Sequence, residues 1–233
     1  MSNFFAKKLY SGLRLLLPPH CLLCGAGSGD AIACAACRRE LPALGEACPR
    51  CALPSVGAAV CADCYVRPPP LDFAVAAFRY AFPVDRMIQA LKYRGTLAMA
   101  DALADALAIA VRRAGIARVD ALVALPLAAA RQRERGFNQA GEIARPLASA
   151  LAVRLDAGLA RVRATPPQAS LAWRERAPNV RGAFAAEHAF SGARVAIVDD
   201  VMTTGATLHA AARALRAAGA REVGAFVVAR ALR

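Results

Sequence analysis

The sequence has few lysines, few acidic residues and no long apolar run. Lysine occurs only at positions 7, 8 and 92, so nearly all of the 30 basic side chains are arginine. Enrichment in arginine and alanine can follow from a GC-rich coding sequence, so we infer no function from it. Without 18 consecutive apolar residues, no membrane-spanning helix is predicted. Residues 1–19 show neither a signal-peptide core nor a small-residue cleavage site, so we expect a cytoplasmic protein.

Two common phosphate-binding motifs are also missing. There is no P-loop ending in Gly-Lys-Ser/Thr and no Gly-x-Gly-x-x-Gly turn. Only 17 acidic residues offset the basic ones, which gives a net charge of +13. Beyond residue 66 the chain holds 24 basic and 13 acidic side chains. This excess favours binding of phosphates, nucleic acid or another polyanion, although an arginine-rich solvated surface would explain it equally well.

Eight cysteines form four Cys-x-x-Cys pairs, and the second two pairs repeat the first two at an offset of 27 residues. Four thiolates in two such knuckles complete a tetrahedral zinc shell with no open position, so we expect two structural zinc ions. We assume one zinc per half, although an interleaved arrangement would use the same residues. Disulfides are the alternative, and a reducing compartment argues against them. The predicted ligands are Cys21, Cys24, Cys34, Cys37, Cys48, Cys51, Cys61 and Cys64.

Three parts of the chain are predicted. An amphipathic helix covers residues 1–20, and the double zinc ribbon covers residues 21–66. Pro68–Pro70 form a stiff spacer, and residues 71–233 form the larger domain. In that domain strands are predicted at residues 73–80, 119–125, 195–198 and 223–229, with helices between them. This alternation indicates an α/β fold with a mostly parallel sheet flanked by helices.

Residues 194–209 combine a strand, two acids, a small-residue turn and a helix. Val195–Val198 read as a buried strand that is followed by Asp199 and Asp200. The turn Thr203–Thr207 leaves backbone amides free, and together with the helix N-terminus these can bind a phosphate. The carboxylates would repel that phosphate but suit the hydroxyls of a sugar, or a metal. The stretch therefore fits a ribose 5-phosphate, and it resembles the PRPP-binding signature of type I phosphoribosyltransferases. The alternative is an ordinary crossover turn with two surface acids.

A basic motif follows the strand predicted at residues 119–125. It reads Arg131-Gln-Arg-Glu-Arg135-Gly-Phe-Asn-Gln139. The crevice of a parallel sheet lies beyond the carboxyl ends of its strands, so we expect this run to face it. Arginine forks match the oxygens of a diphosphate. On its own, the motif would also fit an exposed basic helix turn.

Residues 163–184 contain three prolines and no sustained periodicity, which predicts a long loop. It could close over a diphosphate, grip an acidic acceptor, or be only a surface excursion. Its candidates for nucleic-acid binding are Arg163, Arg174, Arg176 and Arg181.

Taken together and in this order, these pieces resemble the ComF family of competence-associated, zinc-bearing, phosphoribosyltransferase-like proteins. Besides the cysteine pairs and the Asp199-Asp200 motif, the resemblance rests on Lys92-Tyr93-Arg94-Gly95, Pro126-Leu127, Arg135-Gly136-Phe137-Asn138-Gln139, Thr165, Gln168, Arg176, Asn179 and Gly182-Ala183-Phe184. Family members commonly have a histidine after the Pro-Leu, where this chain has Ala128. Any role for that imidazole is therefore absent here.

The resemblance implies a type I phosphoribosyltransferase-like fold, with PRPP and Mg²⁺ as ligands. It also implies a role in DNA uptake, with single-stranded DNA and other competence or replication-related proteins as partners. Asp199 and Asp200 would hold the ribose hydroxyls, and these two with Arg135 are the predicted catalytic residues. Because a threonine cannot act as a base, Thr203 argues weakly against a purine acceptor. The predicted PRPP-binding residues are Lys92, Arg131, Arg135, Asp199, Asp200, Thr203, Thr204, Gly205, Ala206 and Thr207.

Three functions remain open at this point. The first is a Mg²⁺-dependent phosphoribosyltransferase of unknown acceptor. The second is a nucleic-acid-binding protein that uses PRPP as an effector or not at all. The third is a zinc-ribbon adaptor whose ribose site is vestigial. We favour the first two acting together.

Overall fold

The computed structural model describes residues 20–29, 32–116, 118–163 and 180–232. These divide into two compact units, Met1–Leu41 and Pro42–Arg233. The division separates the two halves of the cysteine repeat, and a single zinc-ribbon domain over residues 21–66 stays a prediction. The helix predicted for residues 1–20 lies outside the described residues, as does most of the predicted loop at 163–184.

The first unit holds the first two cysteine pairs. Its one described helix, α2 (Ala35–Arg39), begins after Cys34, whose Sγ accepts a hydrogen bond from the Cys37 amide at 3.4 Å. A bridge between His20 and Gly27 and a bond from the Leu22 amide to the Ile32 carbonyl close the preceding turn. So short a unit has little core, and we expect metal binding to supply much of its folding energy.

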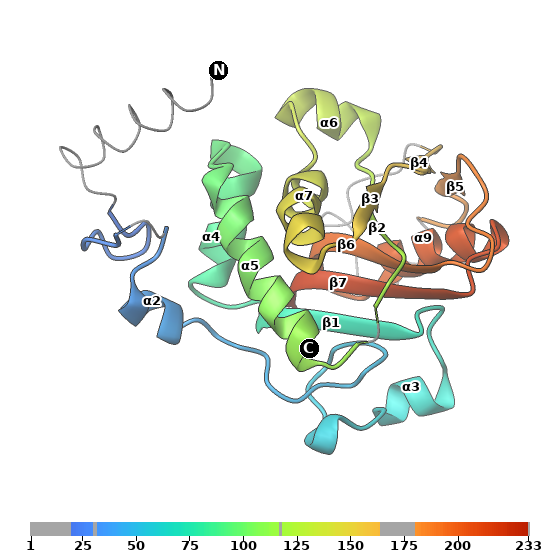
Figure 1. Ribbon diagram of the computed structural model, residues 1–233, viewed down its shortest axis with the longest axis horizontal. Coiled ribbons are helices and arrows are strands. Elements are labelled where there is room, and N and C mark those ends of the chain that lie inside the picture. Colours follow the sequence, from blue (N-terminus) through green and yellow to red (C-terminus); the bar gives the residue numbers. More distant parts are fainter. Residues whose placement is uncertain (1–19, 30–31, 117, 164–179, 233) are drawn as a thin grey trace. The chain divides into compact units, whose positions relative to one another are not determined.

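The second unit is built on a five-stranded sheet in which every neighbouring pair is parallel. The spatial order is β1-β7-β6-β2-β3 (Figure 1). The bounds are β1 Phe73–Arg79, β7 Glu222–Arg230, β6 Arg194–Met202, β2 Ala121–Ala124 and β3 Arg154–Asp156. The α/β fold class with a mostly parallel sheet is thus confirmed.

Helices cover the two faces of this sheet. Helix α5 (Ala98–Arg113) packs on β1 and β7, and beside it α7 (Gln139–Leu151) packs on β2, β3 and β6 (Figure 1). Helix α9 (Ala206–Ala217) packs on β6 and β7. Crossovers between parallel strands are right-handed. Because β2 to β3 and β6 to β7 run in opposite directions across the sheet, α9 lies on the face opposite α7.

This reversal creates a topological switch point between β6 and β2. Ligands of open α/β sheets bind in the crevice beyond the carboxyl ends of the strands at such a point. Asp199 and Asp200 lie near the carboxyl end of β6. The short helix α6 (Ala129–Arg135) follows the carboxyl end of β2. The fold therefore brings both sequence motifs to one edge of the sheet.

The core uses β-branched strand residues and alanine-rich helices. Val195–Val198 are fully buried, as a strand covered on both faces requires. On α5 the predicted stripe of Met99, Leu103, Leu107 and Val111 is buried. The other buried positions of α5 are alanines, Ala100, Ala104 and Ala108. None of the helices in the described ranges has the length and apolarity needed to span a bilayer.

The second half of the cysteine repeat belongs to this same unit. Residues 42–49 run along the outer edge of β1, where the Leu44 amide donates to Ala77 and the Ala74 amide donates to Pro49. This pairing covers an edge strand that would otherwise expose its backbone. The remaining elements are η1 Val56–Ala58, α3 Ala62–Val66, α4 Val84–Arg94 and the antiparallel pair β4 Leu159–Arg161 with β5 Phe184–Ala186.

The structure differs from the sequence expectations in a few local features. Strand β6 continues to Met202, so the two acids lie within the strand instead of after it. Helix α9 begins at Ala206, two residues earlier than expected, because Gly205 with φ of 79° serves as its N-cap. Helix α6 agrees with the exposed basic helix turn given as the alternative for its motif, whereas the short strand β3 was not expected, since it is too short to show a clear period.

We expect Gly224→Ala to destabilise the second unit by about 1–3 kcal/mol, the usual cost of overpacking. In the β1–β7 register Gly224 faces Phe73, and a Cβ at Gly224 would overlap the Phe73 ring. Urea unfolding measures the loss. Phe73→Leu should restore part of the stability of the Gly224→Ala chain, although alone it would destabilise. If the losses of unfolding free energy in the two single variants simply added up in the double variant, this packing would be contradicted.

Candidate functional site

The acid pair on β6 is almost completely buried. The exposed fraction is 9% for Asp199 and 3% for Asp200. The Asp200 amide donates to Asp199 Oδ1 at 2.8 Å, which fixes one carboxylate beside the backbone of the other. Two adjacent buried carboxylates require compensation, because an isolated buried charge is costly.

That compensation comes from side chains of two helices, α4 and α7. The Lys92 ammonium, on α4, forms an ion pair with Asp200 Oδ2. Gln139, at the start of α7, donates from Nε2 to Asp200 Oδ1 at 3.3 Å. Arg135 Nη1 in turn donates to Gln139 Oε1 at 2.5 Å. A chain of polar contacts therefore joins the last residue of α6 to the acid pair.

The two acids have opposite protonation tendencies. Burial, reinforced by the neighbouring Asp200 charge, raises the pKa of Asp199 well above its usual value. Burial opposes the charge on Asp200 most strongly, but the Lys92 ammonium and the side-chain hydrogen bonds of Asp199, Lys92 and Gln139 together outweigh it and lower the pKa of Asp200. For Lys92, burial is the largest effect, but the charge and hydrogen bond of Asp200 together with the Asp199 charge outweigh it, and the pKa of Lys92 is raised. The pKa values of the two acids are therefore shifted in opposite directions, and Asp200 is the acid whose charged form the site stabilises.

The turn Thr203–Thr207 follows the acids directly. Thr204 Oγ1 accepts a hydrogen bond from the Ala206 amide at 3.1 Å, which shapes the turn. A Cβ at Gly205 would lie 2.8 Å from Met202 Cε and 3.0 Å from His209 Nε2, so only glycine fits this left-handed position. The amides at the N-terminus of α9 are the donors that an anion would meet.

A pocket of about 360 Å³ adjoins the acid pair on the side of Lys92. It is lined by Lys92, Tyr93, Gly95, Arg131, Glu134, Arg135 and Phe137. The guanidinium of Arg135 lies over the Tyr93 ring, 5.4 Å from its centroid. The structure thus brings together the three cations expected to bind PRPP. Asn138 orients this region, because it caps α7 and its Nδ2 donates to the Leu125 carbonyl at 3.1 Å.

The cysteines form two clusters, Cys21/Cys24/Cys34/Cys37 and Cys48/Cys51/Cys61/Cys64. This is the sequential grouping, not the interleaved one. In each cluster the sulfur atoms lie within 4.8 Å of one another. The Cys24–Cys34 and Cys51–Cys61 separations are 3.8 and 3.7 Å. A tetrahedral shell with Zn–S bonds of about 2.3 Å has sulfur atoms about 3.8 Å apart, so both clusters fit structural zinc.

The local backbone favours thiolates at equivalent places in the two clusters. Although burial opposes it, amides that include those of Cys34 and Cys24 lower the pKa of Cys21 to about 6. Cys48, at the equivalent position of the second half, is lowered to about 7 in spite of burial, chiefly by the Cys61 amide. Such thiolates are the form that binds a metal.

Protein-family comparisons match the chain in two places. The double zinc ribbon domain family matches residues 12–65, and the phosphoribosyl transferase domain family matches residues 93–233. DNA utilization protein YhgH of Escherichia coli K12 is 34% identical over 94% of this chain and 100% of its own length. Competence protein F of Haemophilus influenzae is 33% identical over 73% of this chain and 78% of its own length. The chain belongs to the ComF family.

A more distant ComF relative and a solved structure complete the comparison. Competence protein ComFC of Bacillus subtilis is 29% identical, covering 86% of this chain and 85% of its own length. The structure of glutamine PRPP amidotransferase from B. subtilis, complexed with ADP and GMP, is 23% identical with a TM-score of 0.38. It covers 55% of this chain and 25% of that one. The family assignment therefore comes from the sequence relatives.

The remaining predicted site residues lie apart from the acid pair or outside the described residues. Arg163 Nη2 donates to the Arg181 carbonyl at 2.6 Å, so these two meet beside the β4–β5 pair. Arg174 and Arg176 lie outside the described residues. Ala128, at the position where ComF proteins commonly have a histidine, precedes α6 and offers no side-chain cap.

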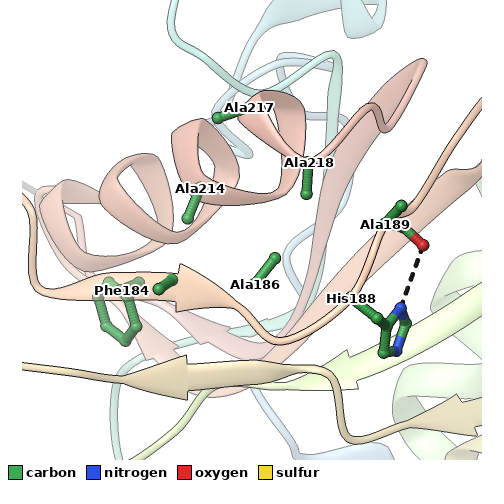
Figure 2. A pocket seen from close by; sticks show the side chains of 8 residues that line it. Phe184, Ala186, His188, Ala189, Ala214, Ala217 and Ala218 are labelled. Atoms are coloured by element: carbon green, nitrogen blue, oxygen red, sulfur yellow. Dashed lines mark hydrogen bonds between the residues drawn. The ribbon is translucent and has the colours of Figure 1, made fainter.

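A larger cavity, of about 600 Å³, lies between β5 and the last turn of α9 (Figure 2). Its lining is mainly alanine, with Phe184 and His188. Both nitrogens of His188 are engaged, Nδ1 with the Ala189 carbonyl at 3.1 Å and Nε2 with Asp156 Oδ1 at 3.0 Å. The cavity contains none of the predicted site residues, and its alanine methyl groups offer no convergent donors.

Sequence reasoning gave no individual role to Gln139 and none to Arg230. Gln139 has a usable signal, because it follows Arg135 by four residues and begins a helix at the crevice. Arg230 had no signal, since it is the last residue of a strand in an arginine-rich chain. Only the fold shows that both contact the acid pair or the turn that follows it.

We expect Asp199→Asn to stabilise the protein increasingly as pH rises. Asp199 keeps its proton in the folded state above the pH at which it ionises unfolded. Its contribution is therefore greatest below its unfolded pKa and is lost as pH rises through the folded pKa. Asparagine mimics the protonated acid and does not titrate. Urea unfolding at pH values rising from about 4, the ordinary pKa of an aspartate, should show a growing advantage of the variant, and a pH-independent difference would refute the raised pKa of Asp199.

Proposed function

We propose that this ComF protein binds PRPP with Mg²⁺ beyond the carboxyl ends of β6 and β2. The observation that carries the proposal is the contact chain from Arg135 through Gln139 to Asp200, which joins a cationic pocket to a buried acid pair. A role in DNA uptake and natural transformation follows from the names of its relatives. The cytoplasmic location and the partners expected from the sequence remain part of the same proposal.

Each part of PRPP has a chemically matched part of the protein. The turn Thr203–Thr207 offers amides and hydroxyls to the 5-phosphate. Oxygens of Asp199 and Asp200 accept hydrogen bonds from the ribose hydroxyls, because a carboxyl group keeps an acceptor oxygen in both its ionised and its protonated form. Arg131 and Arg135 bind the diphosphate, as planar guanidinium groups suit phosphate oxygens. When bound, Mg²⁺ would be held through oxygens of these carboxylates and the diphosphate, and it would neutralise leaving-group charge.

Lys92 has a double role in this proposal. In the structure its ammonium neutralises Asp200, while the same side chain lines the pocket that holds Arg131 and Arg135. Ribose hydroxyls can replace the ammonium as hydrogen-bond donors to Asp200. Lys92 is then released toward the diphosphate, so the burial cost of Asp200 is met in both states.

The chemistry at this site would be displacement at the anomeric carbon. The bond from C1 to the diphosphate oxygen breaks, and its electron pair leaves with pyrophosphate. A nucleophile of the acceptor forms the new bond to C1 and loses its proton. With water as the acceptor the products are ribose 5-phosphate and pyrophosphate. Arg131 and Arg135 stabilise the charge that develops on the leaving group.

Titration calorimetry with PRPP and Mg²⁺ tests the proposal. Asp200→Asn should weaken PRPP binding by at least about tenfold, because a charged hydrogen-bond acceptor is lost. Asp105→Asn, on the exposed side of α5, is the matched control and should bind as the wild type does. Arg131→Gln should weaken pyrophosphate binding more than ribose 5-phosphate binding. Failure of the wild type to bind millimolar PRPP would reject the function.

Single-stranded DNA binding is a second candidate, favoured by aromatic exposure beside the cationic pocket. Tyr93 is 72% exposed and Phe82 is 76% exposed, and both lie at the ends of α4, next to Lys92 and Pro83. Exposed rings among cations can stack bases while the cations contact phosphates. Arg163 and Arg181 add basic side chains on the β4–β5 pair.

Anisotropy titration of a labelled oligo(dT) at 50 and 200 mM salt tests the second candidate. We expect affinity to fall steeply with salt as counterions are released. Tyr93→Ala should weaken binding by about 1–3 kcal/mol. Tyr65→Ala is the matched control, because Tyr65 is 81% exposed but lies on α3. Absent or salt-insensitive affinity, or equal losses in both variants, would contradict DNA binding at this site.

A further inference from the structure

Arg230, the last residue of β7, is buried beside the turn Thr203–Thr207. We call this segment the phosphate-binding turn, after the role that the proposed function gives it. Its exposed fraction is 2%, although its side chain is always charged. Nη1 donates to the carbonyls of Met202 at 2.9 Å, Thr203 at 2.5 Å and Ala231 at 2.7 Å. These bonds hold carbonyl groups at the start of the turn, which leaves amides of the same turn for an anion.

The same guanidinium also reaches the second cysteine cluster. Arg230 Nε donates to the Cys51 carbonyl at 2.8 Å. Cys51 is one of four predicted ligands of that cluster, and the Cys48–Cys51 knuckle is closed by a bond from the Ala52 amide to the Cys48 carbonyl at 2.9 Å. Because a guanidinium is planar and rigid, displacement of the Cys51 carbonyl is transmitted to the carbonyls of Met202 and Thr203.

The second cysteine cluster and the phosphate-binding turn also share a cavity and an apolar core, which supports the connection through Arg230. A cavity of about 270 Å³ is lined by Cys51 and Cys64 of the cluster, by Thr204 of the turn, and by His209 and Arg230. Cys48, Cys51 and Cys64 are part of the same apolar cluster as Met202 and Ala206. The cluster is therefore packed into the domain that carries the turn.

The first cluster has no such role among the described residues, although it has the same spacing. It belongs to the other compact unit, and Cys24 is exposed. The chain thus contains two metal shells that are alike in ligands and differ in surroundings. Position 37 in the first half is equivalent to position 64 in the second, which offers a matched pair of variants.

We propose that Arg230 is a positioning residue that couples metal binding at Cys48, Cys51, Cys61 and Cys64 to the shape of the phosphate-binding turn. This inference rests on the proposed function only in taking PRPP as the ligand of the turn. The effect of zinc on the structure of the turn can be measured without PRPP. Loss of the second zinc would let the Cys48–Cys51 knuckle relax, and Arg230 would no longer hold Met202 and Thr203 in place. Loss of the first zinc would leave the turn unchanged.

The test compares Cys64→Ser with Cys37→Ser in the full chain. Each should lose about one of two zinc ions, measured by a colorimetric metal assay. Hydrogen–deuterium exchange of the amides at residues 203–207 should speed up by about tenfold or more in Cys64→Ser and stay at the wild-type rate in Cys37→Ser. PRPP affinity should weaken by about tenfold in Cys64→Ser alone.

Arg230→Lys tests the coupling itself. It should keep both zinc ions but show faster exchange in the turn, because a lysine ammonium cannot bond Cys51 and the turn through one rigid plane. Combining it with Cys64→Ser should add less than about twofold to the larger single effect, since both changes break one connection. Purely structural destabilisation would instead give additive effects.

Zinc removal provides a measurement that needs no Cys64 variant. Cys37→Ser protein retains only the second zinc, so a graded chelator titration should speed exchange in the turn in step with zinc loss. Exchange that is independent of zinc, equal in both cysteine variants or unchanged in Arg230→Lys would overturn the coupling. If the wild type fails to bind PRPP, the proposed function fails, and the exchange data still decide this inference.

Discussion

The candidate site depends on how one buried negative charge is satisfied. Asp200 is 3% exposed and retains its charge because Lys92 and Gln139 contact it. These partners come from α4 and α7, and even the nearer one, Gln139, lies 61 residues before Asp200 in the sequence. The acid pair cannot be buried until those helices have docked, so the site and the sheet form together. Removing the ammonium without a replacement donor would leave an uncompensated charge in the crevice.

The sheet order explains why these particular elements meet. The switch point lies between β6 and β2, and each strand is followed by a polar motif at its carboxyl end. The acids lie in β6 and the small-residue turn in its connection to β7, whereas the arginines of α6 belong to the connection from β2 to β3, which runs the other way across the sheet. A ligand that spans the crevice would therefore meet carboxyl oxygens and backbone amides on one side and guanidinium groups on the other. This asymmetry suits a molecule with phosphate groups at both ends of a sugar.

Much of this arrangement could be predicted from sequence because it is local. The strand at Val195–Val198, the acids, the turn and the cysteine pairs are each encoded within a few residues, and the resemblance to ComF proteins adds their order. The contact of Lys92 with Asp200 could not be predicted, since it depends on the packing angle of α4 against the sheet. Gln139 was visible in a motif, but its role follows only from its position 3.3 Å from Asp200. Short elements such as β3 and α6 carry too few residues for a period to emerge.

The cysteine repeat shows the same limit in another form. Spacing specifies a four-sulfur shell in both halves, but it does not specify what packs around the shell. Surroundings arise from distant parts of the chain: Cys51, Met202 and Arg230 meet only after β1 has paired with β7 and β7 with β6. Contacts of such long sequence separation carry a loop-closure cost that contacts between neighbouring residues do not. A turn held by them is completed only when the beginning and the end of the second unit have come together, and a binding site placed there reports that the unit has folded.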